Sequence, residues 1–161
     1  LDLSGKTVTY GLTDSDMPSG SVLQVVTATD QTQRSTTSTS YVTAGNTLAV
    51  NITPISTSSK ILVLVSVIGG HSTGGGKIGY FTIFRGSTDL GSTAGNGNGL
   101  SQNYGGSSDV RTSMNMNILD SPSTTSQITY QVYIKDDGSS GQVDINWNNC
   151  KGTITAMEIG G

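Results

Sequence analysis

Hydrophobic and polar residues alternate in short runs along most of the chain, and clusters of Gly, Ser, Asn, Asp and Pro separate these runs. Short runs with period-two alternation and turn residues between them are typical of β-strands. Thr, Val, Ile and Tyr dominate the runs, as expected for a pleated surface that is half buried. The pattern predicts strands at residues 22–27, 39–42, 48–53, 61–68, 78–85, 110–119, 128–135, 143–147 and 153–159.

The alternation also predicts which side of each strand faces the core. Leu48, Val50 and Ile52 share one face of their strand, while Asn51 lies on the opposite face. Such a strand buries one face and leaves the other in water. Residues 61–68 differ because both faces are apolar except at Ser66. We expect this strand to be central, with the core covering one face and a neighbouring subunit covering the other.

The predicted architecture is all-β. No run supports a helix of ten residues, so crossover helices are missing and the strands are expected to be antiparallel. We therefore expect two antiparallel sheets that pack against each other in a β-sandwich of jelly-roll type. We assign residues 20–161 to this head domain and residues 1–19 to the end of a fibre shaft and its linker. Two glycine-rich segments, residues 69–77 and 86–108, are predicted to be long loops that carry the interaction surface.

Composition narrows the class of protein. Of the 161 residues, 33% are hydrophobic and 12% are charged, with a formal net charge of −3. A disordered chain would combine low hydrophobicity with a high net charge, which is not the case here. Nucleic-acid binding normally needs a basic patch, and the eight Lys and Arg residues are scattered singly. No apolar run approaches the length of a membrane span, so we expect neither nucleic-acid binding nor membrane insertion. Cys150 is the only cysteine, which favours synthesis in a reducing compartment such as a bacterial cytoplasm.

One segment imitates a catalytic motif. Gly70-His71-Ser72-Thr73-Gly74 matches the G-x-S-x-G elbow, in which a nucleophilic serine sits between a strand and a helix. The motif also needs a separate histidine as base, whereas His71 is the only histidine and occupies the motif's own variable position. Glycines and another predicted strand follow instead of a helix. We therefore predict no catalytic residues and no enzyme activity.

Metal ligands are also few. One His and one Cys cannot supply a structural zinc site within one chain. Asp136-Asp137-Gly138 offers oxygen ligands, but an Asp-Gly turn explains the pattern and a calcium site there remains an alternative. A further alternative places three His71 side chains on a trimer axis around an ion. The principal prediction is that the chain has no metal site and no cofactor.

Candidate receptor contacts are aromatic and amide side chains in the predicted loops. Tyr104 is a candidate platform for stacking on a sugar, and the nearby asparagines can donate hydrogen bonds. Trp147 is a second platform, although a lone tryptophan on a strand is more typical of a core or an interface. The complete candidate set is Tyr104, Asn96, Asn98, Asn103, His71 and Trp147.

The order of several short motifs resembles the distal domains of tail fibres from bacteriophages, especially cyanophages and other phages of aquatic bacteria. The resemblance spans nearly the whole chain. The motifs are Leu-Asp-Leu-Ser-Gly-Lys-Thr-Val-Thr at 1–9, Gly-Ser-Val-Leu-Gln-Val-Val at 20–26, Ser-Thr-Ser-Tyr-Val at 38–42, Ile-Thr-Pro at 52–54, Ser-Ser-Lys-Ile-Leu-Val at 58–63, Leu-Asp-Ser-Pro at 119–122 and Ile-Thr-Ala-Met-Glu-Ile at 154–159.

The resemblance implies a homotrimer in which a fibrous shaft precedes a β-sandwich head that adsorbs to a host surface. It implies no catalytic residues. A single strand at residues 1–10 would have unpaired backbone groups, which three chains wound together would satisfy. The expected trimer contacts in this strand are therefore Leu1, Leu3, Val8 and Tyr10.

Three hypotheses of function follow. The first is a tail-fibre tip, made in the bacterial cytoplasm and carried on the virion, that assembles with other virion proteins and binds a surface glycan or protein of the host. The second is a purely structural virion component, such as a capsid fibre or decoration protein. The third is a carbohydrate-binding sandwich attached to an enzyme, which the shaft-like start disfavours because enzyme linkers are usually rich in Pro or Ser.

Overall fold

The computed structural model describes residues 17–72, 77–91, 99–105, 109–138 and 141–161. Within these ranges the chain is almost entirely antiparallel β-structure, apart from the single 3-10 turn η2 (Trp147–Asn149). The described segments include no helix that has both the length and the apolar character to span a membrane. The predicted fold class is confirmed. The predicted shaft strand at residues 1–10 lies outside the described residues.

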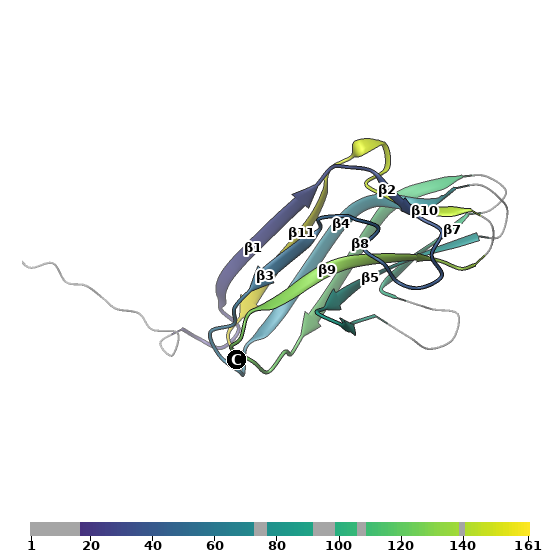
Figure 1. Ribbon diagram of the computed structural model, residues 1–161. Coiled ribbons are helices and arrows are strands. Elements are labelled where there is room, and N and C mark those ends of the chain that lie inside the picture. The colour runs from purple at the N-terminus through teal and green to yellow at the C-terminus, as the bar shows by residue number, and fades with distance from the viewer. Residues whose placement is uncertain (1–16, 73–76, 92–98, 106–108, 139–140) are drawn as a thin grey trace, which may run out of the picture.

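The strands form two sheets that face each other (Figure 1). The first sheet contains β1 (Val22–Asp30), β2 (Arg34–Thr36), β4 (Lys60–Ser72), β8 (Val110–Asp120), β10 (Gln142–Ile145) and β11 (Gly152–Ile159). The second sheet contains β3 (Ala49–Ile52), β5 (Lys77–Arg85), β6 (Thr88–Asp89), β7 (Ser101–Gly105) and β9 (Ile128–Asp136).

The order of the longer strands is that of a jelly roll. The first sheet runs β1-β11-β4-β8, and the second runs β3-β9-β5-β7. Strands β2 and β10 continue the lines of β1 and β11 and pair with each other, while β10 also pairs with β4. From β3 onward the chain alternates between the sheets, except that β5, β6 and β7 all belong to the second sheet and that β10 and β11 both belong to the first. This order gives the two Greek keys of a jelly roll.

The core lies between the sheets and is built from the predicted alternating faces. Leu48, Val50 and Ile52 are buried, as are Met114 and Met116. The same holds for the inward residues of the two central strands, β4 and β9. These are Ile61, Val63, Val65 and Val67 in β4, and Tyr130, Val132 and Ile134 in β9.

Three local predictions are wrong. Residues 39–42 form no strand, and only Val42 makes an isolated bridge, to Ile134 of β9. The segment 69–77 is not one loop, because β4 continues through Ser72 and β5 begins at Lys77. The segment 86–108 contains the strands β6 and β7.

Close packing explains the two glycines inside β4. A Cβ at Gly69 would lie 2.7 Å from the carbonyl oxygen of Asp144 and 2.8 Å from the ring of Phe81. A Cβ at Gly70 would lie 2.0 Å from the carbonyl oxygen of Val110. Glycine in a strand often marks such a close approach, so the pair continues the strand here and does not end it.

In the first sheet, the gap between β1 and β2 lies beside the gap between β10 and β11. Between β10 and β11 the chain bulges out through η2, and Asn146, Asn148 and Asn149 all adopt left-handed backbone conformations with φ of 54–59°. Asparagine tolerates this region better than most residues. Because of this bulge, Trp147 leaves the strand that was predicted for residues 143–147.

Candidate functional site

The outer face of the first sheet carries three rows of side chains that run across four strands. Residues directly opposite each other in adjacent strands point to the same face. We call these three rows the interface rows. They are Val25–Met157–Leu62–Leu119, Thr27–Thr155–Leu64–Asn117 and Thr29–Thr153–Ser66–Asn115.

The first row is apolar throughout and is open to solvent in the single chain. Val25 is 53% exposed and Leu119 is 52% exposed, while Met157 and Leu62 between them are half-buried. Leu64 in the second row is 38% exposed. A continuous exposed patch of this kind usually marks an interaction surface.

The interface rows contain no charged side chain. Threonine, serine and asparagine supply their polar groups, and Thr27 and Thr155 share a hydrogen bond of 3.0 Å between their Oγ1 atoms. A shallow groove on this face is lined by Leu64, Ser66 and Asn117, together with their neighbours on β8 and β11. The face is therefore apolar at one end and neutral and polar in the middle.

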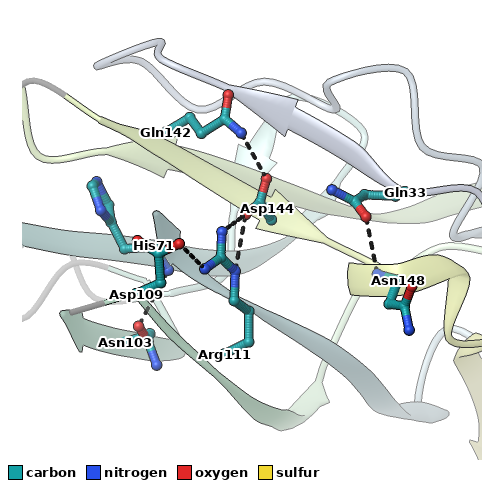
Figure 2. A network of polar contacts seen from close by, with 8 residues as sticks. All are labelled: Gln33, His71, Asn103, Asp109, Arg111, Gln142, Asp144 and Asn148. Atoms are coloured by element: carbon teal, nitrogen blue, oxygen red, sulfur yellow. Dashed lines mark hydrogen bonds and ion pairs between the residues drawn. The ribbon is translucent and has the colours of Figure 1, made fainter. Parts of the chain in front are cut away.

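A charged network lies further along the same face, at the far end of the sandwich from the C-terminus (Figures 1 and 2). Arg111 of β8 and Asp144 of β10 are both paired with Gly70 of β4. Because Gly70 has no side chain, the Arg111 side chain crosses β4, and its Nη2 lies 2.6 Å from Oδ2 of Asp144. Gln142 donates a further hydrogen bond to Asp144 at 3.3 Å.

The Arg111 guanidinium is held on several sides. Its Nη1 lies 2.8 Å from Oδ2 of Asp109, and its central carbon lies 3.9 Å from the centre of the Trp147 ring. Burial lowers the pKa of this guanidinium, but the hydrogen bonds to Asp109 and Asp144 raise it by more, so the net pKa lies above the usual value. The network fixes the bulge that carries Trp147 against the sheet.

A second polar cluster lies between the sheets at the same end. His71 of β4 points inward, and its Nε2 is 2.8 Å from Oδ1 of Asp136 at the end of β9. His71 is 1% exposed and Asp136 is 4% exposed. Asn103 accepts a hydrogen bond from the His71 backbone N–H. The Gly70-His71-Ser72 part of the apparent elbow is thus regular strand, paired with β8 and β10.

The structure separates the predicted receptor residues. Tyr104 is 63% exposed on β7, whereas its neighbour Asn103 is 4% exposed because successive strand residues face opposite ways. The side chains of His71 and Asn103 are buried in the single chain, so neither of these two predicted receptor residues lies at its surface. Trp147 is half-buried under Arg111. Asn96 and Asn98 lie outside the described residues.

The predicted trimer contacts Leu1, Leu3, Val8 and Tyr10 also lie outside the described residues. The interface rows were indicated in the sequence by a single signal, the two-sided apolar character of residues 61–68. The Arg111–Asp144 pair was missed because nothing in the sequence shows that these residues flank the same glycine of β4.

Comparison with known proteins assigns no family. No family profile matches the chain, and no curated protein matches it. Similar solved structures come from infectious bursal disease virus. The T13 particle structure has 18% identity and a TM-score of 0.46, covering 99% of this chain and 39% of that one. The Gt strain structure has 16% identity and a TM-score of 0.44, covering 88% of this chain and 39% of that one.

A VP2 subviral particle structure has 18% identity and a TM-score of 0.41, covering 86% of this chain and 38% of that one. This chain therefore spans about two fifths of the length of these viral chains. The jelly-roll assignment rests on this chain's own strand order.

Proposed function

We propose that the chain is a non-enzymatic structural domain of a virion that assembles as a homotrimer through the interface rows. In this proposal the far end of the sandwich is free to contact a receptor on the host cell. The observation that carries the proposal is the exposed apolar row Val25–Met157–Leu62–Leu119, which lies beside two polar rows without charged side chains.

The neutrality of the face favours another copy of the same chain as its partner. Each chain carries a formal charge of −3, so identical copies repel one another at long range. Because the interface rows contain no charged groups, a contact through them brings no like charges together and leaves no charge to be desolvated without a partner. Side chains that bury apolar surface contribute about 25 cal/mol per Å². The apolar row can supply this contribution, and the Thr, Ser and Asn rows can hydrogen-bond across the contact.

The number of subunits comes from the resemblance of the sequence motifs to tail-fibre distal domains, which implies three. Three-fold assembly also suits adsorption, because linked copies of a weak site bind a surface with greater avidity than one copy does. Strand β7 lies at the end of the sandwich away from the C-terminus (Figure 1). It belongs to the second sheet and carries the exposed Tyr104, whereas the apolar row lies on the first sheet.

The assembly is tested by light scattering on the purified 161-residue chain. We expect three times the 16.6 kDa chain mass. Replacing Val25→Asp together with Leu119→Asp places buried charge in the proposed contact, so we expect monomers with an unchanged circular dichroism spectrum. The control is Tyr104→Asp, which changes an exposed hydrophobic residue on the other sheet and should leave the trimer intact.

A wild-type monomer at all concentrations, or a double variant that remains trimeric, would refute this interface. Adsorption is tested separately on an array of bacterial surface polysaccharides. The trimer is expected to bind at least one polysaccharide, and Tyr104→Ala is expected to weaken that binding. A trimer that binds none would favour a purely structural role in the virion.

A further inference from the structure

Three potential metal ligands from opposite sheets meet at the far end of the sandwich. His71 enters from β4 of the first sheet, Asp136 is the last residue of β9 in the second sheet, and Asp137 follows directly after it. One ligand atom of each residue lies within 4.8 Å of the corresponding atoms of the other two. We propose that these three residues bind one divalent transition-metal cation per chain.

The surrounding backbone holds each ligand in place. The His71 N–H donates to Asn103 Oδ1 at 3.3 Å, and the Asp136 N–H donates to the Ser38 carbonyl at 2.7 Å. The Ile78 N–H donates to Oδ2 of Asp137 at 3.0 Å, which helps to orient this carboxylate. Outer partners that orient the ligands in this way are typical of metal sites in proteins.

The charge at the site also favours a cation. Asp136 is almost fully buried, and among the described residues its ion-pair partner is His71. Lys135, the neighbouring cation on β9, lies over the rings of Tyr41 and Tyr80 on the opposite face of the strand. A buried carboxylate needs a compensating charge, and a divalent cation beside Asp136 would supply one.

The chemistry of the ligands selects the class of metal. Imidazole nitrogen with carboxylate oxygen suits zinc, cobalt and other first-row divalent ions, whereas calcium prefers six to eight oxygen ligands. Metal–ligand bonds of about 2.0–2.2 Å in a tetrahedron place ligand atoms about 3.3 Å apart. The pair His71 Nε2 and Asp136 Oδ1, now 2.8 Å apart, would therefore separate by about half an ångström as the ion replaces the shared proton.

Cobalt(II) is the direct probe because its visible absorption reports four- or five-fold coordination by protein ligands. The chelator-treated chain is titrated with Co²⁺, and then Zn²⁺ is added to displace it. We expect a visible band that saturates at one Co²⁺ per chain and disappears with Zn²⁺. We also expect a melting temperature that rises with Zn²⁺ and falls again with chelator.

Asp137→Asn is the informative variant, since Asp137 is the most exposed of the three ligands and its loss should leave the fold intact. We expect it to weaken Co²⁺ binding at least about tenfold. The matched control is Asp89→Asn, which alters a carboxylate elsewhere on the second sheet and should bind Co²⁺ as the wild type does. Absence of a band with millimolar Co²⁺, or equal binding by Asp137→Asn and wild type, would overturn the proposal.

Discussion

Replacing Arg111→Met tests whether the far-end network stabilises the fold. Asp144 is fully buried and receives two hydrogen bonds from Arg111, at 2.6 and 3.2 Å. The methionine side chain can still cover Trp147, but it leaves the Asp144 carboxylate without its cation. Removing one partner of a buried ion pair costs about 3–5 kcal/mol. For a chain of this size, each kcal/mol lowers the melting temperature by about 2–4 °C. We therefore expect a loss of about 6–20 °C.

The assay is thermal unfolding followed by circular dichroism at one fixed protein concentration, because oligomer stability depends on concentration. The control Arg34→Met removes a more exposed hydrogen bond, from Nε to the Gly45 carbonyl, and should cost about 1 kcal/mol or less. Adding Asp144→Asn to Arg111→Met removes the orphaned charge, so the double variant should regain part of the loss. If Arg111→Met destabilises no more than Arg34→Met, the network contributes little and the reasoning is wrong.

Three further predictions concern single positions. Gly70→Ala would bring a Cβ within 2.0 Å of a backbone oxygen, so it should abolish folding or lower the melting temperature more than any surface alanine does, as a thermal scan would show. Burial raises the pKa of Glu158, but hydrogen bonds from Gln24 and the Ile55 N–H outweigh it and the net pKa is lowered. The Glu158 carboxylate thus stabilises the fold above its unfolded pKa of about 4.5, and this contribution is lost as the pH falls through the lower folded value. Glu158→Gln should therefore be less stable than wild type at pH 7, with a difference that shrinks in urea titrations below pH 4.5. Tyr130→Phe removes the 2.7 Å hydrogen bond to Asp120, and denaturant titration should show a loss of about 1 kcal/mol because Arg85 still pairs with that carboxylate.

Alternation in the sequence was sufficient to predict the buried faces of the long strands. In β3 and β9 the period-two pattern places Val50, Ile52, Tyr130, Val132 and Ile134 on the core side, while Ala49 and Tyr133 lie on the opposite face. The strand at residues 61–68, which has two apolar faces, was also interpreted correctly as central, because β4 lies between β8 and β11.

The hydrophobic pattern failed to predict the structure where contacts between residues far apart in the sequence determine the conformation. Gly69 and Gly70 suggest a turn, yet they extend β4 because Phe81 and the backbone of Val110 leave no space for a side chain. Strand β7 has the sequence Ser-Gln-Asn-Tyr-Gly, which is too polar to signal a strand, and its pairing with β5 provides the ladder. The Arg111–Asp144 pair depends on register across β4, which a single sequence does not reveal.

The most direct test of the central claim, that identical chains meet through the interface rows, is the oxidation of methionine side chains. Met157 lies within the apolar row, while Met17 is 39% exposed and serves as the internal reference. The chain is exposed briefly to dilute peroxide, and sulfoxide formation at each methionine is measured by peptide mass spectrometry. The account predicts that Met157 is protected relative to Met17 in the assembled protein and loses this protection in the Val25→Asp, Leu119→Asp variant. Equal oxidation of Met157 in both proteins would contradict it.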